Sequence, residues 1–270
     1  MATRPCATTC SPDDDAAVAW APVDLRERPD GSTRHPWETS RARFFRRLIS
    51  THVSHAPSSV LDIGSGDSWF AASLLDSLPA TAVIDCWDAH YTAADLAATI
   101  DPRLHRTAAA PSTRYPLVLA LDVLEHVRDD AEFVAEAIAP TVQPGGLLVA
   151  SVPAYQWLFT SHDQALGHFR RHNRASLRAL LQPSFTILQE GSLFMSLVPP
   201  RAAQRLVELV RPPRQAPAQV QSGWQHGATF TRAVAGVLDA DARLGLAAAR
   251  RRVPLPGLSV WAVCRMDERG

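Results

Sequence analysis

The sequence predicts an α/β fold with a doubly wound, mostly parallel sheet and helices on both of its faces. Short apolar runs alternate with segments of helical periodicity along most of the chain. Several of these runs are almost wholly apolar, as parallel strands that are buried on both faces are. A glycine-containing turn directly follows the first run. Together these three observations favour an open sheet with right-handed crossovers between its strands.

The chain begins its regular structure with a helix and then alternates strand and helix. We expect an N-terminal cap helix within residues 34–57, because Pro36 suits a first turn and Phe44, Leu48 and Ile49 share one face. The strands are predicted, in order, at residues 59–64, 81–88, 116–123, 147–153, 185–194 and 257–265. The helices between them are predicted at residues 69–78, 93–100, 129–142 and 174–183.

Residues 195–256 are predicted to form a helical insertion before the last strand. It contains two helical segments, residues 201–211 and 231–252, joined by a link rich in Pro, Gln and Ser. The first segment is basic and amphipathic. A helix that faces the core and exposes its arginines is the favoured interpretation. A helix that lies on a membrane surface or meets a lipid-linked substrate is the alternative.

The composition restricts the class of protein. The 270 residues include 27 basic and 27 acidic side chains, so the sequence gives no reason to expect a nucleic-acid partner. Residues 1–33 are predicted to be a disordered leader, and residues 34–270 one domain. No segment reads as a signal peptide or a membrane span, so we expect a cytoplasmic protein without integral membrane association. Oligomeric state is left open.

The cysteines do not predict a metal site. Cys6 and Cys10 lie in the leader, and no second Cys or His pair has the spacing of zinc ligands. Cys86 and Cys264 lie in apolar runs and are predicted to be buried free thiols.

The turn after the first strand reads DIGSGDSW, with Asp62, Gly64, Ser65 and Gly66. A dinucleotide loop would have a third glycine where Trp69 stands, which disfavours NAD or FAD. Glycines let a ligand approach the backbone closely. An acid before them suits the ammonium of an amino-acid tail and would repel a pyrophosphate. S-adenosylmethionine has such a tail, and an ordinary strand-to-helix turn is the alternative.

An acid at the end of the next strand would bind the two ribose hydroxyl groups of such a cofactor. Asp85 and Asp88 both qualify. We favour Asp88, which is closer to the end of the strand, and keep Asp85 as the substitute. Asp122 follows a central strand, where ligands of open sheets bind, and a helix N-cap is its alternative role.

Four segments in order resemble the motifs of class I S-adenosylmethionine-dependent methyltransferases. They are VLDIGSGDS, IDCWDAHY, LALDVLEHV and PGGLLVASVP. HPWETSR, SHDQALGHFRRHNRASL and LPGLSVWAVCR resemble a bacterial subgroup that acts in small-molecule and glycan pathways. The resemblance implies a Rossmann-like methyltransferase sheet and places Asp122 and Val123 beside S-adenosylmethionine. It departs at the third strand, where RLHRTAAAPST offers no acid for the adenine amine.

The predicted catalytic set is His162, Asp163 and His168, which follow the fifth strand of the motif order. A histidine held by an acid can take the proton that an acceptor oxygen or nitrogen loses. A polar loop that closes over the site is the alternative. Glu125 and His126 lie beside the cofactor by resemblance, and His126 is a minor candidate.

Four further residues are predicted to bind substrate or cofactor groups. Arg170 and Arg171 would clamp a carboxylate or phosphate of the substrate, unless they pair with local acids. By resemblance, Trp37 would cover the cofactor and Arg41 would meet its carboxylate, unless the first helix only packs there.

The expected reaction is in-line methyl transfer from S-adenosylmethionine to a small-molecule or glycan-type acceptor. Oxygen is the favoured acceptor atom, nitrogen the second, and carbon is not excluded. A biosynthetic role is implied by the resemblance alone. Two alternatives stay open: a nicotinamide-dependent oxidoreductase, and a methyltransferase-like module that binds a partner without catalysis.

Overall fold

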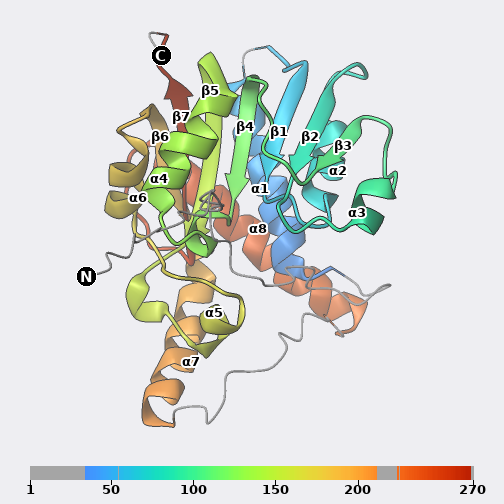
Figure 1. Ribbon diagram of the computed structural model, residues 1–270. Helices are drawn as coiled ribbons and strands as arrows, with labels where there is room; N and C mark the ends of the chain where they lie inside the picture. Colours follow the sequence, from blue (N-terminus) through green and yellow to red (C-terminus); the bar gives the residue numbers. More distant parts are fainter. Residues whose placement is uncertain (1–33, 54, 212–223, 225, 269–270) are drawn as a thin grey trace, which may run out of the picture.

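A computed structural model describes residues 34–53, 55–211, 224 and 226–268 of the chain (Figure 1). The predicted leader and the link 212–223 lie outside these residues. Seven strands form one sheet in the order β3-β2-β1-β4-β5-β7-β6. The pairings from β3 to β5 are parallel, and β7 is antiparallel to both β5 and β6. The predicted doubly wound, mostly parallel sheet is therefore confirmed.

The elements follow the predicted order closely. The strands are β1 (Ser59–Ile63), β2 (Val83–Trp87), β3 (Leu104–Thr107), β4 (Tyr115–Leu121), β5 (Val142–Pro153), β6 (Phe185–Leu193) and β7 (Ser259–Met266). The α-helices are α1 (Pro36–His52), α2 (Trp69–Leu75), α3 (Ala93–Ala97), α4 (Asp130–Glu132), α5 (Ser161–Ala165), α6 (Arg174–Leu181), α7 (Val198–Val210) and α8 (Ala228–Arg250). The short 3-10 turns are η1 (Leu124–His126), η3 (Ala139–Thr141), η4 (Gln156–Leu158) and η5 (Met195–Leu197).

One predicted helix is divided in the structure. Residues 129–142 form α4, the π-helical turn η2 (Phe133–Ile138) and η3 in place of one regular helix. Pro140 lies in the first turn of η3 and has no backbone N–H to donate, so an α-helix cannot continue through it.

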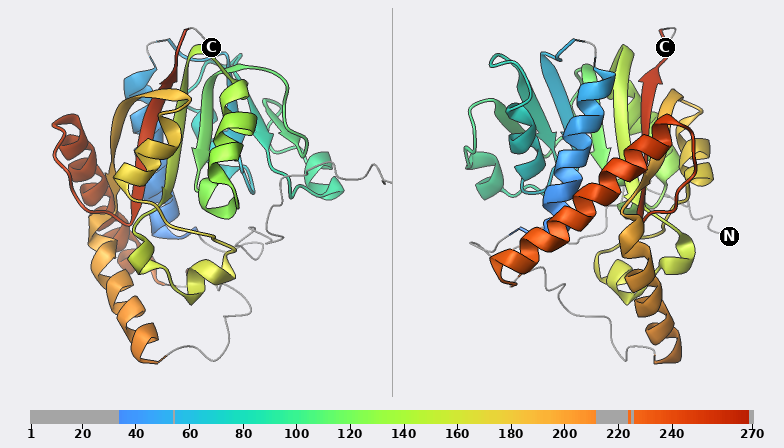
Figure 2. Two further views of the ribbon diagram at one scale, coloured as in Figure 1. Left: turned by 60° about the vertical axis from the view of Figure 1, so that its left-hand side comes forward. Right: turned by 180° about the vertical axis from the view of Figure 1, so that it is seen from behind.

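Helices cover both faces of the sheet (Figure 2). Helices α1, α2 and α8 pack on one face, around the buried side chains of Phe45, Leu48 and Trp261. The η2 segment and α6 pack on the other face, around Phe133 and Leu181. Cys86 and Cys264 are buried free thiols, one in each layer, as predicted.

Helix α7 does not face the core, and that prediction is wrong. None of its thirteen residues is buried, and Leu206, Val207, Leu209 and Val210 are 60–72% exposed. Two polar contacts join it to the segment around α5: Arg201 pairs with Asp163, and Glu208 accepts hydrogen bonds from Ser161. The helix therefore supports the segment around α5, below the sheet in Figure 1.

Helices α7 and α8 both lie between β6 and β7 in the chain, at the place predicted for the helical segment. In the described part of the chain, no helix is long and apolar enough to cross a membrane.

Candidate active site

A cavity of about 510 Å³ lies at the carboxyl edge of the parallel strands. Its wall combines the glycine loop after β1, the start of α1, the turn after β4, the segment 162–171 and the start of α7. Residues predicted for the site that line it are Trp37, Arg41, Gly64, Gly66, Asp122, His162, Asp163, His168 and Arg171. A volume of this size suits a small-molecule ligand.

The glycine loop has the backbone that its sequence requires. Gly64 and Gly66 have φ of +64° and +52°, a region that other residues rarely adopt. A Cβ on Gly64 would lie 2.6 Å from a methyl group of Val123, so this glycine lets the loop pack on the turn after β4. A Cβ on Gly66 would meet nothing within 4 Å. Gly66 therefore offers open backbone to a ligand, whereas Val123 supports the loop from behind.

The two candidate acids, the favoured Asp88 and its substitute Asp85, lie in different surroundings. Asp88 accepts hydrogen bonds from the backbone N–H groups of Gly66 and His90, both at 2.9 Å. Asp85 accepts a hydrogen bond from the Tyr115 hydroxyl at 2.6 Å and pairs with His105. Asp88 is thus the acid at the glycine loop, whereas Asp85 joins β2 to His105 of the neighbouring β3 and, across β1, to Tyr115 of β4.

Asp62 is buried at the end of β1. Burial raises the pKa of its carboxyl group to about 7, while the positive charge of Arg41 opposes this rise and the charge of Asp88 adds to it. A ligand ammonium placed here would favour the ionised carboxylate.

Two residues that the sequence did not single out hold the loop. The Tyr91 hydroxyl lies 2.6 Å from the Ser65 hydroxyl and 2.7 Å from that of Ser68. Arg106, on β3, donates to the Ser68 hydroxyl and lies over the Tyr91 ring. Ser65 therefore stabilises the loop through its side chain and does not line the cavity.

Asp122 and Arg41 form an ion pair of 2.8 Å across the cavity wall. Asp122 also accepts a hydrogen bond from Ser151, and its φ of +60° is unusual for a residue with a side chain. Its carboxylate caps no helix, so the N-cap alternative is wrong: the N-cap position of η1 is Val123. The Arg41 guanidinium also lies over Trp37, with its Nε buried and unpartnered.

Asp163 is the centre of a buried ion-pair network. Its Oδ1 lies 3.0 Å from Nδ1 of His168 and 2.6 Å from Arg171, and its Oδ2 lies 2.5 Å from Arg201. Burial alone would raise the pKa of Asp163, but hydrogen bonds from His168 and Arg171 hold it well below its usual range. The carboxylate is therefore ionised and fixes the ring of His168. Arg201 is a site residue that the sequence did not indicate.

The other three residues predicted for the catalytic and substrate-binding sites differ in their position and partners. His162 lines the cavity, and burial, aided by the charge of Arg201, lowers its pKa. Arg171 lines it too, but its guanidinium is committed to Asp163 and to the carbonyl of Ala154. Arg170 does not line the cavity and pairs with Asp130 at 2.7 Å, which is the local-acid alternative.

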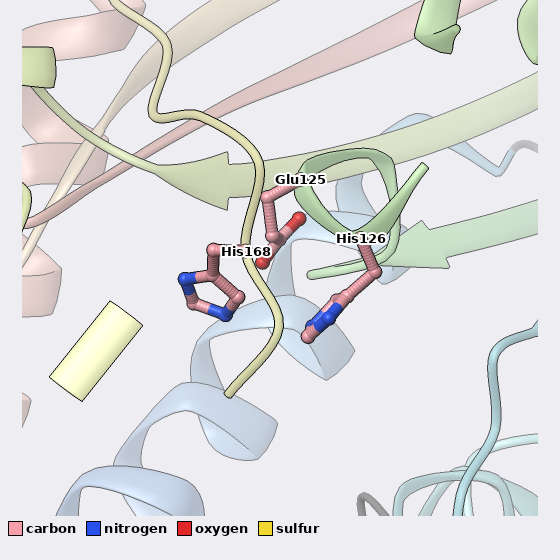
Figure 3. A group of neighbouring side chains, drawn as sticks. All are labelled: Glu125, His126 and His168. Carbon is pink, nitrogen blue, oxygen red and sulfur yellow. The ribbon is translucent and has the colours of Figure 1, made fainter. Parts of the chain in front are cut away.

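Glu125, His126 and His168 form a cluster in the same wall (Figure 3). Glu125 is fully buried, and within the described part of the chain neither of its carboxyl oxygens has a hydrogen-bond partner. Burial, with the charge of Asp122, raises its pKa well above the usual range. Burial and the nearby His168 lower the pKa of His126 to about 3, so this ring is neutral. The two imidazole rings meet edge to face at 4.6 Å.

These residues fit an adenosyl cofactor with an amino-acid tail. The open backbone at Gly66 permits close approach, and Asp62 provides a buried acid for an ammonium group. Asp88 accepts a hydrogen bond from the backbone of Gly66, so this acid lies at the glycine loop. Among proteins with a doubly wound sheet, this arrangement defines the class I S-adenosylmethionine-dependent methyltransferases.

The family comparison agrees with this class. Residues 34–211 match the methyltransferase domain family, described as "Methyltransferase domain". The chain therefore belongs to that family. The predicted family and cofactor, S-adenosylmethionine, are confirmed, and the nicotinamide alternative is set aside.

Individual relatives are more distant. The chain is 27% identical over 164 residues to a ubiquinone biosynthesis O-methyltransferase, mitochondrial, of Arabidopsis thaliana; the match covers 54% of this chain and about half, 51%, of that protein. The structure resembles coclaurine N-methyltransferase bound to N-methylheliamine and S-adenosylhomocysteine (TM-score 0.51, 11% identity, covering 84% of this chain and 70% of that one). It also resembles phosphoethanolamine N-methyltransferase 2 of Haemonchus contortus in complex with S-adenosyl-L-methionine (TM-score 0.50, 11% identity, 83% and 52%). At these identities the likeness concerns the fold.

Proposed function

We propose that this protein transfers a methyl group from S-adenosylmethionine to a small-molecule or glycan-type acceptor, at oxygen, in a biosynthetic pathway. One observation carries the proposal: the glycine loop and a histidine held by a buried acid face the same cavity. The name of the plant relative, an O-methyltransferase of ubiquinone biosynthesis, supports oxygen and a biosynthetic role.

Four residues around the glycine loop have separate tasks in this proposal. Asp62 and Asp88 are buried behind the cavity lining, beside the loop, and bind the ammonium and the ribose of the cofactor. Arg41 and Trp37 line the cavity; Arg41 binds the carboxylate of the cofactor and Trp37 covers it. When bound, S-adenosylmethionine supplies a methyl group whose bond to sulfur breaks as the new bond to the acceptor oxygen forms, the electron pair staying on sulfur. Because the sulfonium needs no activation, orienting the acceptor in line provides much of the rate.

The acceptor proton passes to a histidine of the cavity. His168 is favoured over His162, because Asp163 fixes its Nδ1 and leaves Nε2 to accept the proton. Arg171 and Arg201 position Asp163 and are not themselves catalytic.

The test is methyl transfer from radiolabelled S-adenosylmethionine to a panel of phenols, sugars and amines. Once an acceptor is found, His168→Ala should lower kcat by about 10²-fold or more, the usual size of a general-base effect, with little change in KM for S-adenosylmethionine. His162→Ala should have a smaller effect. Equal, wild-type rates in both variants would refute the general-base role and leave positioning as the source of the rate.

A further inference from the structure

The cluster of Glu125, His126 and His168 has a feature that methyl transfer does not explain. One carboxylate and two imidazoles offer ligand atoms that all lie within 4.8 Å of one another. Figure 3 shows the two rings on either side of the Glu125 carboxyl group. All three residues line the cavity, so a bound ion would be in contact with the acceptor.

Both oxygens of Glu125 are buried and have no hydrogen-bond partner among the described residues. A buried polar group without a hydrogen-bond partner destabilises the fold, and more so when it is charged. Since Glu125 is fully buried, rearrangement toward solvent cannot relieve this cost. A cation bound between the carboxyl group and the two imidazole rings would give these oxygens a partner and so relieve the cost.

The ring of His168 is held by an acid outside the cluster. Its Nδ1 lies 3.0 Å from Asp163, which two arginines fix in turn. An outer carboxylate or carbonyl partner that orients the imidazole and leaves its other nitrogen free is the usual support of a metal-binding histidine.

We propose that Glu125, His126 and His168 bind a divalent first-row cation, with Zn²⁺ as the reference ion. With bonds of about 2.0–2.2 Å and tetrahedral angles, two ligand atoms on one ion lie roughly 3.3–3.6 Å apart. The cluster, whose ligand atoms lie within 4.8 Å of one another, must therefore close by about 1.2–1.5 Å at its widest. Side-chain rotation supplies a movement of this size. Three protein ligands leave a fourth position open, as catalytic sites do, and here it opens to the cavity.

This inference rests on the proposed function and deepens it. A hydroxyl group of the acceptor that coordinates the cation ionises more readily, since a bound cation lowers the pKa of its ligand oxygen. In the cation-bound form Nε2 of His168 is a ligand and not the base, and the acceptor proton passes to His162, which also lines the cavity. The proposal therefore restricts the acceptor to small molecules with a hydroxyl group that can coordinate a metal ion.

The experiment measures cation binding directly, without an acceptor. The protein used is the full chain with Cys6→Ser and Cys10→Ser, because these substitutions remove the leader thiols that could bind zinc. Bound metal ions are first removed with a chelator. Zn²⁺ alone is titrated by calorimetry, and Co²⁺ is titrated by its visible absorption. Glu125→Gln, nearly isosteric, and His168→Gln are compared with His55→Gln, an exposed histidine distant in sequence from the cluster.

The expected result is one cation per chain, a Co²⁺ spectrum with nitrogen and oxygen ligands, and at least tenfold weaker binding in Glu125→Gln and His168→Gln but not in His55→Gln. Absence of binding, or equal affinity in Glu125→Gln and the parent, would overturn the site. If His168→Gln does not fold, the affinity of Glu125→Gln for the cation, compared with that of the parent, decides the test. S-adenosylhomocysteine is titrated into the same metal-free protein. If this ligand binds but no cation does, the metal site alone is refuted. If S-adenosylhomocysteine does not bind, the proposed function is refuted.

Discussion

The affinity for S-adenosylhomocysteine should depend on pH through Asp62. Burial raises the pKa of this carboxyl group to about 7 in the free protein, with Arg41 opposing and Asp88 adding to the rise. A ligand ammonium favours the ionised form, so binding lowers this pKa. Below pH 7 the protein must therefore release a proton in order to bind, and affinity must rise as the pH rises toward and above 7.

The magnitude follows from the titration of one group. About one carboxyl in eleven is ionised at pH 6, and about ten in eleven at pH 8. The dissociation constant should therefore be about tenfold larger at pH 6 than at pH 8, a difference of roughly 1.4 kcal/mol in binding free energy. At pH 7, about half a proton should be released for each ligand bound.

Calorimetry at the two pH values, in two buffers of different ionisation enthalpy, measures both quantities. Asp62→Asn is the matched control, because it keeps the shape of the side chain and cannot titrate. It should bind more weakly than the parent, with little dependence on pH. If Asp62→Asn kept the same tenfold slope, another group would be responsible, and the ammonium contact assigned to Asp62 would be refuted.

Three further predictions concern stability and the loop. Gly64→Ala should destabilise the protein by about 1–3 kcal/mol, because its Cβ would lie 2.6 Å from Val123, as measured by chemical denaturation. Gly66→Ala should cost only about 1–2 kcal/mol of stability, from its positive φ, but should weaken S-adenosylhomocysteine binding at least tenfold; unchanged binding would show that the ligand does not approach this backbone. Asp163→Asn should cost about 3–5 kcal/mol, since buried guanidinium groups such as that of Arg171 would lose their countercharge; a loss below 1 kcal/mol in urea denaturation would contradict the network.

The loop and the sheet could be predicted because their signals are local. Strands buried on both faces are apolar throughout, and the turn at Gly64 and Gly66 needs glycine for its backbone. Position near the end of the strand was enough to favour Asp88 over Asp85, but their hydrogen-bond partners, the Gly66 backbone and the Tyr115 hydroxyl, come from distant segments and needed the structure.

The error at α7 has a physical reason. Amphipathic spacing shows which residues share a helix face, but not what that face meets. In α7 the deciding contacts are Arg201 with Asp163 and Glu208 with Ser161, which join segments distant in the chain. No periodicity reports such pairs, and the cluster of Glu125 with His168 escaped the sequence for the same reason.

The central claim is that the glycine loop and Asp88 bind S-adenosylmethionine, and one titration tests it most directly. S-adenosylhomocysteine is titrated by calorimetry into the wild type, Asp88→Ala and Asp85→Ala. We predict micromolar binding, about −8 kcal/mol, for the wild type and for Asp85→Ala, and a collapse of binding in Asp88→Ala. No binding to the wild type, or equal binding to all three proteins, would contradict the account.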